Sequence, residues 1–248
     1  MVDHKRAYDV YLKVQTRWVW ILMSLVVTLS SAAQTVRPLI DENVLKAADK
    51  VARGKIEYVN DSLQPLTVTL DVRSFTVSEV GDISYRPVDP GIRLKLSAMS
   101  FRIMPQQVYS VWYEASAEQL PAWFVIYATF SGFHARTPQG FRIQVQLPHT
   151  VYLLPKNAVG KDQLALVATS YSTNEKKIII RVKNTGTTLA RVLETEVLGK
   201  HTQSNNSGFP IFPQAERQVE ISWTADAIPE KVRLRLERFT LEGPVQTE

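Results

Sequence analysis

The sequence predicts an all-β fold of two β-sandwich domains joined by a short linker, behind an N-terminal signal peptide. Three observations predict it: many segments alternate apolar and polar residues, turn-forming residues separate them, and a polar, proline-containing break divides them into two blocks. The 248 residues are enough for two domains of ordinary size. With 45% hydrophobic and 21% charged residues, the chain has the composition of a globular protein.

Residues 1–33 have the three parts of a secretory signal peptide. Basic side chains come first, an apolar run occupies 18–29, and small residues follow at 30–33. The apolar run is shorter than the roughly 20 residues that a membrane-spanning helix needs. We therefore expect cleavage after Ala33, which would leave no membrane span in the mature chain. The alternative is an N-terminal anchor that is never cut.

Alternation of apolar and polar residues is clearest in four segments. In such a segment, one set of side chains faces a core and the intervening set faces the other side of the sheet. These segments are 66–72, 141–147, 178–182 and 232–236. Further runs rich in β-branched, aromatic and other apolar residues predict strands at 55–59, 92–96, 108–113, 123–130, 151–154, 164–168 and 219–223.

The stretch 41–53 has two interpretations. Its acidic start, basic end and helix-favouring residues would suit a helix of about three turns. Because the neighbouring segments are all β-rich, we expect instead a strand around Val44 followed by a turn.

Turn-forming residues separate the predicted strands. Clusters of Asn, Asp, Gly, Pro and Ser favour tight changes of chain direction. They predict turns at 60–62, 81–82, 89–91, 184–186 and 205–208.

A cluster of Pro, Gly and polar residues at 154–162 lies between the two β-rich blocks. We interpret it as a linker between a first domain at 34–155 and a smaller second domain at 160–248. Each domain is close to the roughly 100 residues of an immunoglobulin-like sandwich. The predicted architecture is therefore two immunoglobulin-like domains.

The sequence contains no recognisable catalytic, metal or cofactor motif. The absence of cysteine excludes disulfides, thiolate zinc sites, iron–sulfur clusters and cysteine nucleophiles. The four histidines lack the spacing that brings two imidazoles to one metal, and the common nucleotide-binding and hydrolase motifs are missing. The net charge of +5 is too small to indicate nucleic-acid binding. We therefore predict a protein that is not an enzyme and has no metal, cofactor or nucleic-acid partner.

Six segments stand out by their order and spacing. They are VNDSLQPLTVTLDVRSF (59–75), SFRIMPQQVYSVWYE (100–114), LPAWFVIYATF (120–130), FRIQVQLPHTVYLLPK (141–156), IIIRVKNTG (178–186) and FPIFPQAERQVEISW (209–223). Together they resemble the periplasmic chaperones of pilus and fimbria assembly, as a divergent member would. These chaperones consist of two immunoglobulin-like domains.

The resemblance implies donor-strand complementation, in which the chaperone lends the last strand of its first domain to an incomplete pilus or fimbria subunit. This is a form of β-augmentation. An outer-membrane usher would then receive the subunit from the periplasm. The implied subunit-binding side chains are Phe141, Ile143, Val145 and Leu147. The alternative is that these side chains face only their own core.

The resemblance also implies that an arginine and a lysine anchor the subunit's carboxylate in the cleft between the domains. Arg37 matches the arginine, but Thr150 stands where the lysine is expected, with His149 beside it. Threonine is uncharged and cannot form the ion pair that a lysine forms. The sequence therefore departs from the family's pattern at this position.

Two other classes of function compete with a chaperone. A structural or adhesive sandwich module would be expected to keep its strand edges short, charged or covered. A carbohydrate-binding or enzymatic sandwich would need a groove of exposed aromatic residues. Trp112, Trp123 and Trp223 lie in or beside predicted strands, where we expect them to pack in the core.

Overall fold

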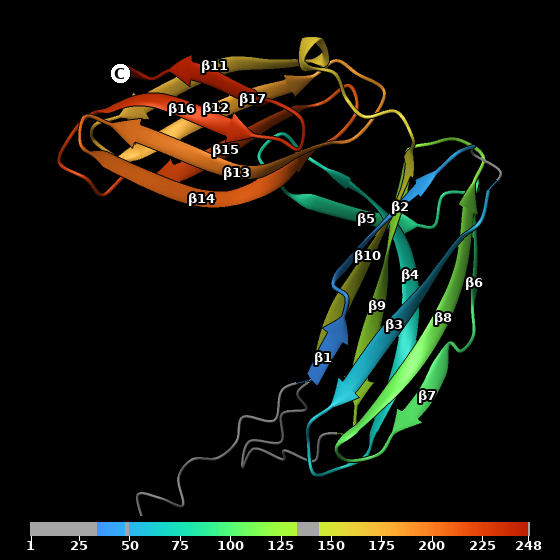
Figure 1. Ribbon diagram of the computed structural model, residues 1–248. Helices are drawn as coiled ribbons and strands as arrows, with labels where there is room; N and C mark the ends of the chain where they lie inside the picture. The colour runs from blue at the N-terminus through green and yellow to red at the C-terminus, as the bar shows by residue number, and fades with distance from the viewer. Residues whose placement is uncertain (1–33, 48–49, 133–143, 248) are drawn as a thin grey trace, which may run out of the picture.

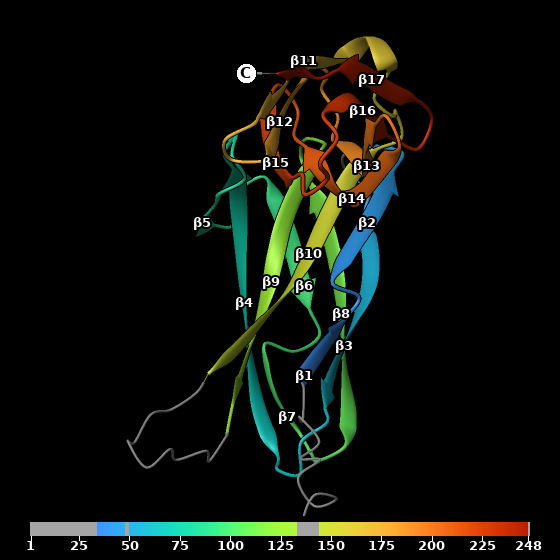
Figure 2. The same cartoon turned by 90° about the vertical axis from the view of Figure 1, so that its left-hand side faces the viewer.

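The computed structural model describes residues 34–47, 50–132 and 144–247. The predicted signal segment 1–33 lies outside these residues. The described chain folds into two β-sandwiches set at an angle, as Figures 1 and 2 show. The predicted fold class is confirmed.

The first sandwich contains sheets A and B. Sheet A has the strand order β1-β3-β8-β6, and sheet B has the order β2-β10-β9-β4-β5, with β7 also beside β4. Strands β2 and β10 run parallel, whereas the other paired strands of these two sheets run antiparallel. The strands are β1 (Gln34–Arg37), β2 (Ile40–Leu45), β3 (Ala52–Asn60), β4 (Leu66–Val77), β5 (Ile83–Pro87), β6 (Ile92–Leu96), β7 (Ser100–Ile103), β8 (Gln107–Ala117), β9 (Ala122–Ser131) and β10 (Val145–Pro155).

The second sandwich contains sheets C and D and follows a short connection that includes the 3₁₀ helix η1 (Lys161–Gln163). Sheet C has the order β15-β12-β11-β18, and sheet D has the order β14-β13-β16-β17. The strands are β11 (Leu164–Ser172), β12 (Lys177–Asn184), β13 (Ala190–Gly199), β14 (Thr202–Ile211), β15 (Glu216–Ser222), β16 (Pro229–Arg235), β17 (Thr240–Pro244) and β18 (Gln246–Thr247).

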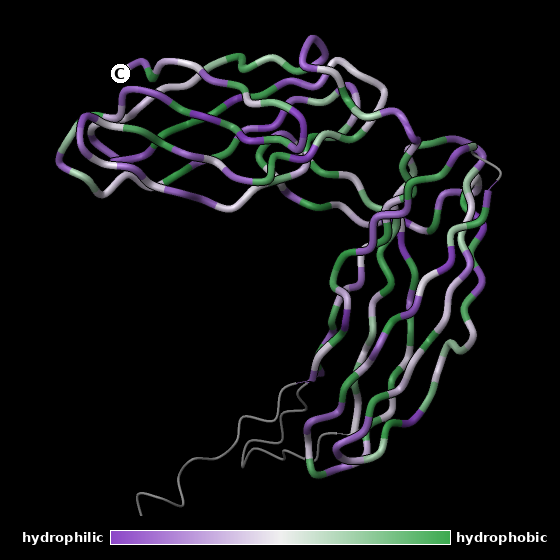
Figure 3. The backbone as a smooth tube through the Cα atoms, in the orientation of Figure 1, coloured by the Kyte–Doolittle hydropathy of each residue, from purple (hydrophilic) through white to green (hydrophobic). Residues whose placement is uncertain are grey.

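Each sandwich has its own apolar core, built from the alternating residues of its strands. Ile56, Phe124 and Leu153 are fully buried in the first core, and Ile178 and Val232 are fully buried in the second. The alternation is visible in Figure 3 as green and purple segments along the same strand. Burial of one face explains why the alternating patterns predict strands correctly.

The described residues of the ambiguous stretch 41–53, which leave out 48 and 49, form no helix. Strand β2 ends at Leu45, a bend follows, and β3 begins at Ala52. Val44 lies in β2, as expected. Here tertiary pairing with β10 overrides a local helix propensity.

The turn predicted at 205–208 is wrong. These residues lie inside β14, which pairs with β13 from Thr202 to Ile211. The chain reverses earlier, between Gly199 and Thr202. Strand β14 is an edge strand of sheet D, so polar side chains there can face solvent without cost.

The expectation for the three tryptophans holds only in part. Trp223 is buried in the second core, and Trp123 is partly buried. Trp112 is 60% exposed on the outer face of sheet A, where the Lys55 ammonium lies 5.7 Å from its ring centroid. Alternation along β8 places Val111 and Tyr113 in the core and therefore directs Trp112 outward.

A third apolar cluster joins the two sandwiches. Phe212 of the second sandwich packs against Phe75 and Trp123 of the first, with ring centroids 6.2 Å and 4.7 Å apart. The Gln218 backbone N–H also donates to the Glu79 carbonyl over 2.7 Å. These contacts connect the sandwiches through side chains and backbone as well as through the linker.

Candidate partner-binding edge

Strand β10 has a partner strand on both sides over only part of its length. Strand β9 pairs with it from Val145 to Leu153, but β2 pairs with it only from Thr150 to Pro155. Among the described residues, no strand pairs with the outer side of 145–149. We call residues 145–149 the open edge. In Figures 1 and 2, β2 lies beside the upper part of β10 and β1 lies lower down.

The open edge exists because the first segment of the chain changes sheets. Strand β1 pairs with β3 in sheet A, and the chain then crosses to sheet B through Pro38. The Thr150 N–H donates to the Leu39 carbonyl over 2.8 Å, which is where pairing with β10 begins. Below that bond, β1 belongs to the other sheet and does not pair with β10.

The backbone groups on the open edge follow from this bond. Backbone groups of successive residues in a strand point to opposite sides. The backbone N–H of Thr150 points toward β2. The backbone groups of Gln146 and Pro148 therefore point to the same side, and those of Leu147 point toward β9. Proline has no N–H. The open edge therefore presents the N–H and C=O of Gln146 and the C=O of Pro148.

The side chains of the open edge alternate in exposure. Val145 and Leu147 are half-buried and pack against the first core, whereas Gln146 and Pro148 are exposed. The structure thus places two of the four predicted apolar contacts on one face of the strand. The other two, Phe141 and Ile143, lie outside the described residues.

His149 is the last residue of the open edge, and its side chain lies in the core. The carbonyl of Pro38 can only accept, so His149 Nδ1 carries the proton and donates to it over 2.6 Å. The other ring nitrogen, Nε2, is buried without a partner among the described residues. Burial lowers the pKa of His149, although the bond to Pro38 and the Asp41 carboxylate act in the opposite direction. His149 is fully buried and is therefore not among the side chains left open to a partner.

Beside His149, a small polar cluster secures β2. The Tyr113 ring lies 6.0 Å from the His149 ring, centroid to centroid. Its hydroxyl donates to the Asp41 carboxylate and accepts from the Asn43 side-chain amide over 3.0 Å. Burial, followed by the bond to Asp41, raises the pKa of Tyr113, so the phenol stays protonated. The cluster fixes the point at which the open edge ends.

Arg37 and Thr150 both lie near the point where the chain crosses from β1 to β2. Arg37 is the last residue of β1, and Thr150 lies in β10 beside the first residue of β2. Arg37 ends β1 opposite Glu57 of β3 and is exposed. The structure gives its guanidinium no ion pair with any residue it describes. Thr150 is half-buried and pairs in register with Ile40. The two residues that the resemblance singled out thus come from adjacent elements at one end of the open edge.

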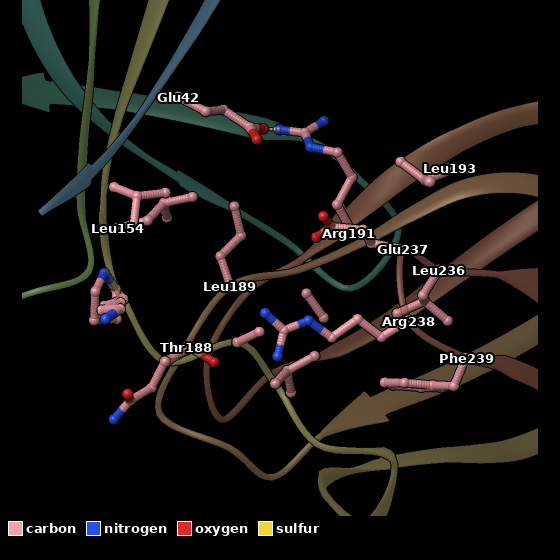
Figure 4. A pocket seen from close by; sticks show the side chains of 17 residues that line it. Glu42, Leu154, Thr188, Leu189, Arg191, Leu193, Leu236, Glu237, Arg238 and Phe239 are labelled. Atoms are coloured by element: carbon pink, nitrogen blue, oxygen red, sulfur yellow. Dashed lines mark ion pairs between the residues drawn. The ribbon is translucent and has the colours of Figure 1, made fainter.

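A hollow of about 640 Å³ lies where the two sandwiches meet, and Figure 4 shows it from close by. Glu42 of β2 and Arg191 of β13 form an ion pair across it. The Arg191 guanidinium also lies 5.4 Å from the Tyr152 ring centroid. The hollow is therefore bridged by a contact between the sandwiches.

No group of three or more metal-binding side chains occurs in the part of the chain that the structure describes. Within the same residues, no helix is long and apolar enough to span a membrane.

Comparison with solved structures identifies the fold. The YadV chaperone is 12% identical, with 85% of this chain and 97% of that chain covered and a TM-score of 0.52. The SafB chaperone of Salmonella enterica, solved with the SafA pilin, is 9% identical, with 88% and 98% covered and a TM-score of 0.52. CsuC of Acinetobacter baumannii, from the CsuC–CsuE pre-assembly complex of Csu pili, is 11% identical, with 88% and 100% covered and a TM-score of 0.51.

The fold is that of the fimbrial chaperones. The resemblance noted in the sequence is confirmed at the level of the fold. No family model matches the sequence, and no curated protein matches it.

Sequence reasoning missed Pro148, although a signal was present. Proline within a sheet is confined to edge strands, strand starts and bulges. A proline directly after the alternating run 141–147, and before the apolar run 151–154, therefore indicates that one side of this strand is unpaired.

Proposed function

We propose that this chain is a periplasmic chaperone that binds incomplete pilus or fimbria subunits through the open edge of β10 and delivers them to an outer-membrane usher. The observation that carries the proposal is the half-paired state of β10, at residues 145–149. The likeness of the fold to chaperones solved with a pilin or a tip subunit supports it. In this proposal the chain is not an enzyme and needs no cofactor.

The chemistry of the open edge suits an incomplete β-sandwich. A subunit that lacks a strand exposes an apolar groove and unpaired backbone groups. In β-augmentation, backbone hydrogen bonds supply affinity and alternate side chains fill pockets. Gln146 and Pro148 offer backbone groups, and Val145 and Leu147 offer apolar side chains on one face. We propose that Phe141 and Ile143 continue this apolar series.

The polar contacts of the proposed site are weaker than a pair of cations would give. Arg37 is an exposed cation beside the end of the open edge, and we propose that it attracts a subunit carboxylate. Thr150 offers at most a hydroxyl, and its N–H is already bonded to Leu39. His149 acts only indirectly, by holding Pro38.

One observation favours a structural module without a client. Natural sheets protect their edges with proline, among other devices, and Pro148 lies on the open edge. In that case the exposed backbone groups would serve no partner, and the chain would bind no subunit.

Co-expression with fimbrial subunits tests the proposal. The tagged chain is produced in the periplasm with each fimbrial subunit encoded in the genome of its source, and soluble complexes are isolated. We expect Val145→Asp to abolish recovery of a subunit that the parent chain keeps soluble. Gln146→Asp is the matched control, because it adds the same charge on the exposed face of the strand. Circular dichroism establishes that both variants fold.

A parent chain that folds but keeps no subunit soluble would favour the structural module. A subunit recovered equally by the parent and by a folded Val145→Asp variant would show that binding does not use this face of β10.

A further inference from the structure

Pro148 is placed differently from the other prolines in the strands. Pro87, Pro210 and Pro244 lie on the edge strands β5, β14 and β17, Pro155 is the last residue of β10, and Pro229 is the first residue of β16. Pro148 lies within a strand that has neighbours on both sides only a few residues later. It therefore stands at the boundary where β10 changes from an edge strand to an internal strand.

Pro148 has no backbone N–H on the side of β10 that is open, where another residue at this position would present one. Thr150 directs its N–H to Leu39, so position 148, two residues earlier, directs its backbone groups to the same side. A strand added along the open edge can bond to the N–H of Gln146. At position 148 it finds a carbonyl but no donor, and at position 150 the donor is already occupied.

An added strand that continued past Gln146 would bury a carbonyl without a hydrogen-bond donor. Such unpaired buried groups are strongly disfavoured. Beyond position 148 the added strand gains no further bond to β10 that would offset the loss, because β2 occupies the outer side from Thr150 onward.

We propose that Pro148 is a specificity-determining residue that ends the pairing of a subunit strand with β10. This inference rests on the proposed function and deepens it. Its occupant is the strand of the incomplete subunit, whose pairing with β10 ends at Gln146. Pro148 thus sets the register, because a strand whose paired part extended further would lose a bond at position 148.

Amide hydrogen exchange on the free chain tests the geometry first. The Pro148→Ala variant gains a backbone amide at position 148, and this amide points to the open side. We expect it and the Gln146 amide to exchange fast, and the Thr150 amide to exchange slowly. Slow exchange of the added amide in the free chain would overturn the inference, since the edge would then be covered at that position.

The complex with the subunit that the parent chain keeps soluble tests the proposal itself. In that complex we expect protection of the Gln146 amide. With Pro148→Ala we expect protection of the added amide as well, and dissociation about fivefold slower, as one added hydrogen bond implies. Pro87→Ala is the matched control, because it changes an edge-strand proline of the same sandwich away from β10; we expect its dissociation rate to equal the parent's.

The outcomes separate the two proposals. A subunit that binds the parent and Pro148→Ala equally, with the added amide of the variant still exposed, overturns the role of Pro148 and leaves the chaperone function standing. A parent chain that binds no subunit overturns both.

Discussion

The two halves of β10 differ in pairing although they belong to one strand. Residues 150–153 lie between β9 and β2, whereas 145–149 pair with β9 alone among the described strands. Val151 and Leu153, in the half that pairs on both sides, are buried. Val145 and Leu147, in the open edge, are half-buried. A single strand can thus anchor a domain with one end and present an edge with the other.

The difference arises from the preceding segment and not from β10 itself. Both halves pair with β9 in one continuous register, from Val145 to Leu153. What changes is the neighbour, because the chain crosses from sheet A to sheet B at Pro38. The position of that crossing decides how much of β10 stays open.

The largest expected effect is on the free energy of unfolding, because the side chains of the two halves of β10 differ in burial. Leu153→Ala removes a fully buried side chain and should destabilise the first sandwich by about 2–5 kcal/mol. Leu147→Ala, at a half-buried position, should cost about 1 kcal/mol or less. Urea denaturation of the two variants measures both. Equal losses would mean that Leu147 is as much a part of the core as Leu153.

A smaller effect on the free energy of unfolding is expected from the backbone N–H groups, because only one half of β10 bonds to a strand on its outer side. Thr150→Pro removes the N–H that donates to Leu39 and leaves that carbonyl without its donor, at a cost of about 1–3 kcal/mol. Gln146→Pro removes an N–H that faces no described strand, so the free energy of unfolding should stay near the parent value. A comparable loss in Gln146→Pro would show that the open edge is paired within the chain.

The smallest expected effect concerns His149, at the border between the halves. Burial lowers its pKa below the ordinary value of about 6.5. Below pH 6.5 the unfolded chain therefore binds a proton that the folded chain resists, and the free energy of unfolding falls as the pH drops from that value toward the folded pKa. We expect His149→Gln to flatten this slope.

Urea denaturation at several pH values between 7.5 and 5 measures the slope. His201→Gln is the control, because His201 is exposed in the turn between β13 and β14. A slope equally steep in His149→Gln and in the parent would show that another group causes the acid sensitivity.

The sequence predicts the strands better than it predicts their edges. Alternation at 66–72 or 178–182 reflects burial of one face, which is a local property. The open edge depends on where β1 gives way to β2, more than a hundred residues earlier in the chain, and local patterns do not contain that pairing. The turn wrongly predicted at 205–208 has the same cause, since polar residues suit an edge strand as well as a turn.

The candidate site was predictable in part. Resemblance and position pointed to Val145 and Leu147, and both lie on the open edge. Neither indicated that His149 is buried, because that depends on the carbonyl of Pro38 and on the packing of Tyr113. Pro148 was the one local signal of an unpaired side.

The most direct test of the central claim removes one backbone donor from the open edge. Capture of a co-expressed fimbrial subunit is compared for the parent, Gln146→Ala and Gln146→Pro, after circular dichroism shows that all three fold. Gln146→Ala keeps the N–H and loses only the side chain, whereas Gln146→Pro loses the N–H. The account predicts capture by the parent and by Gln146→Ala, and loss of capture by Gln146→Pro. Undiminished capture by Gln146→Pro would contradict it.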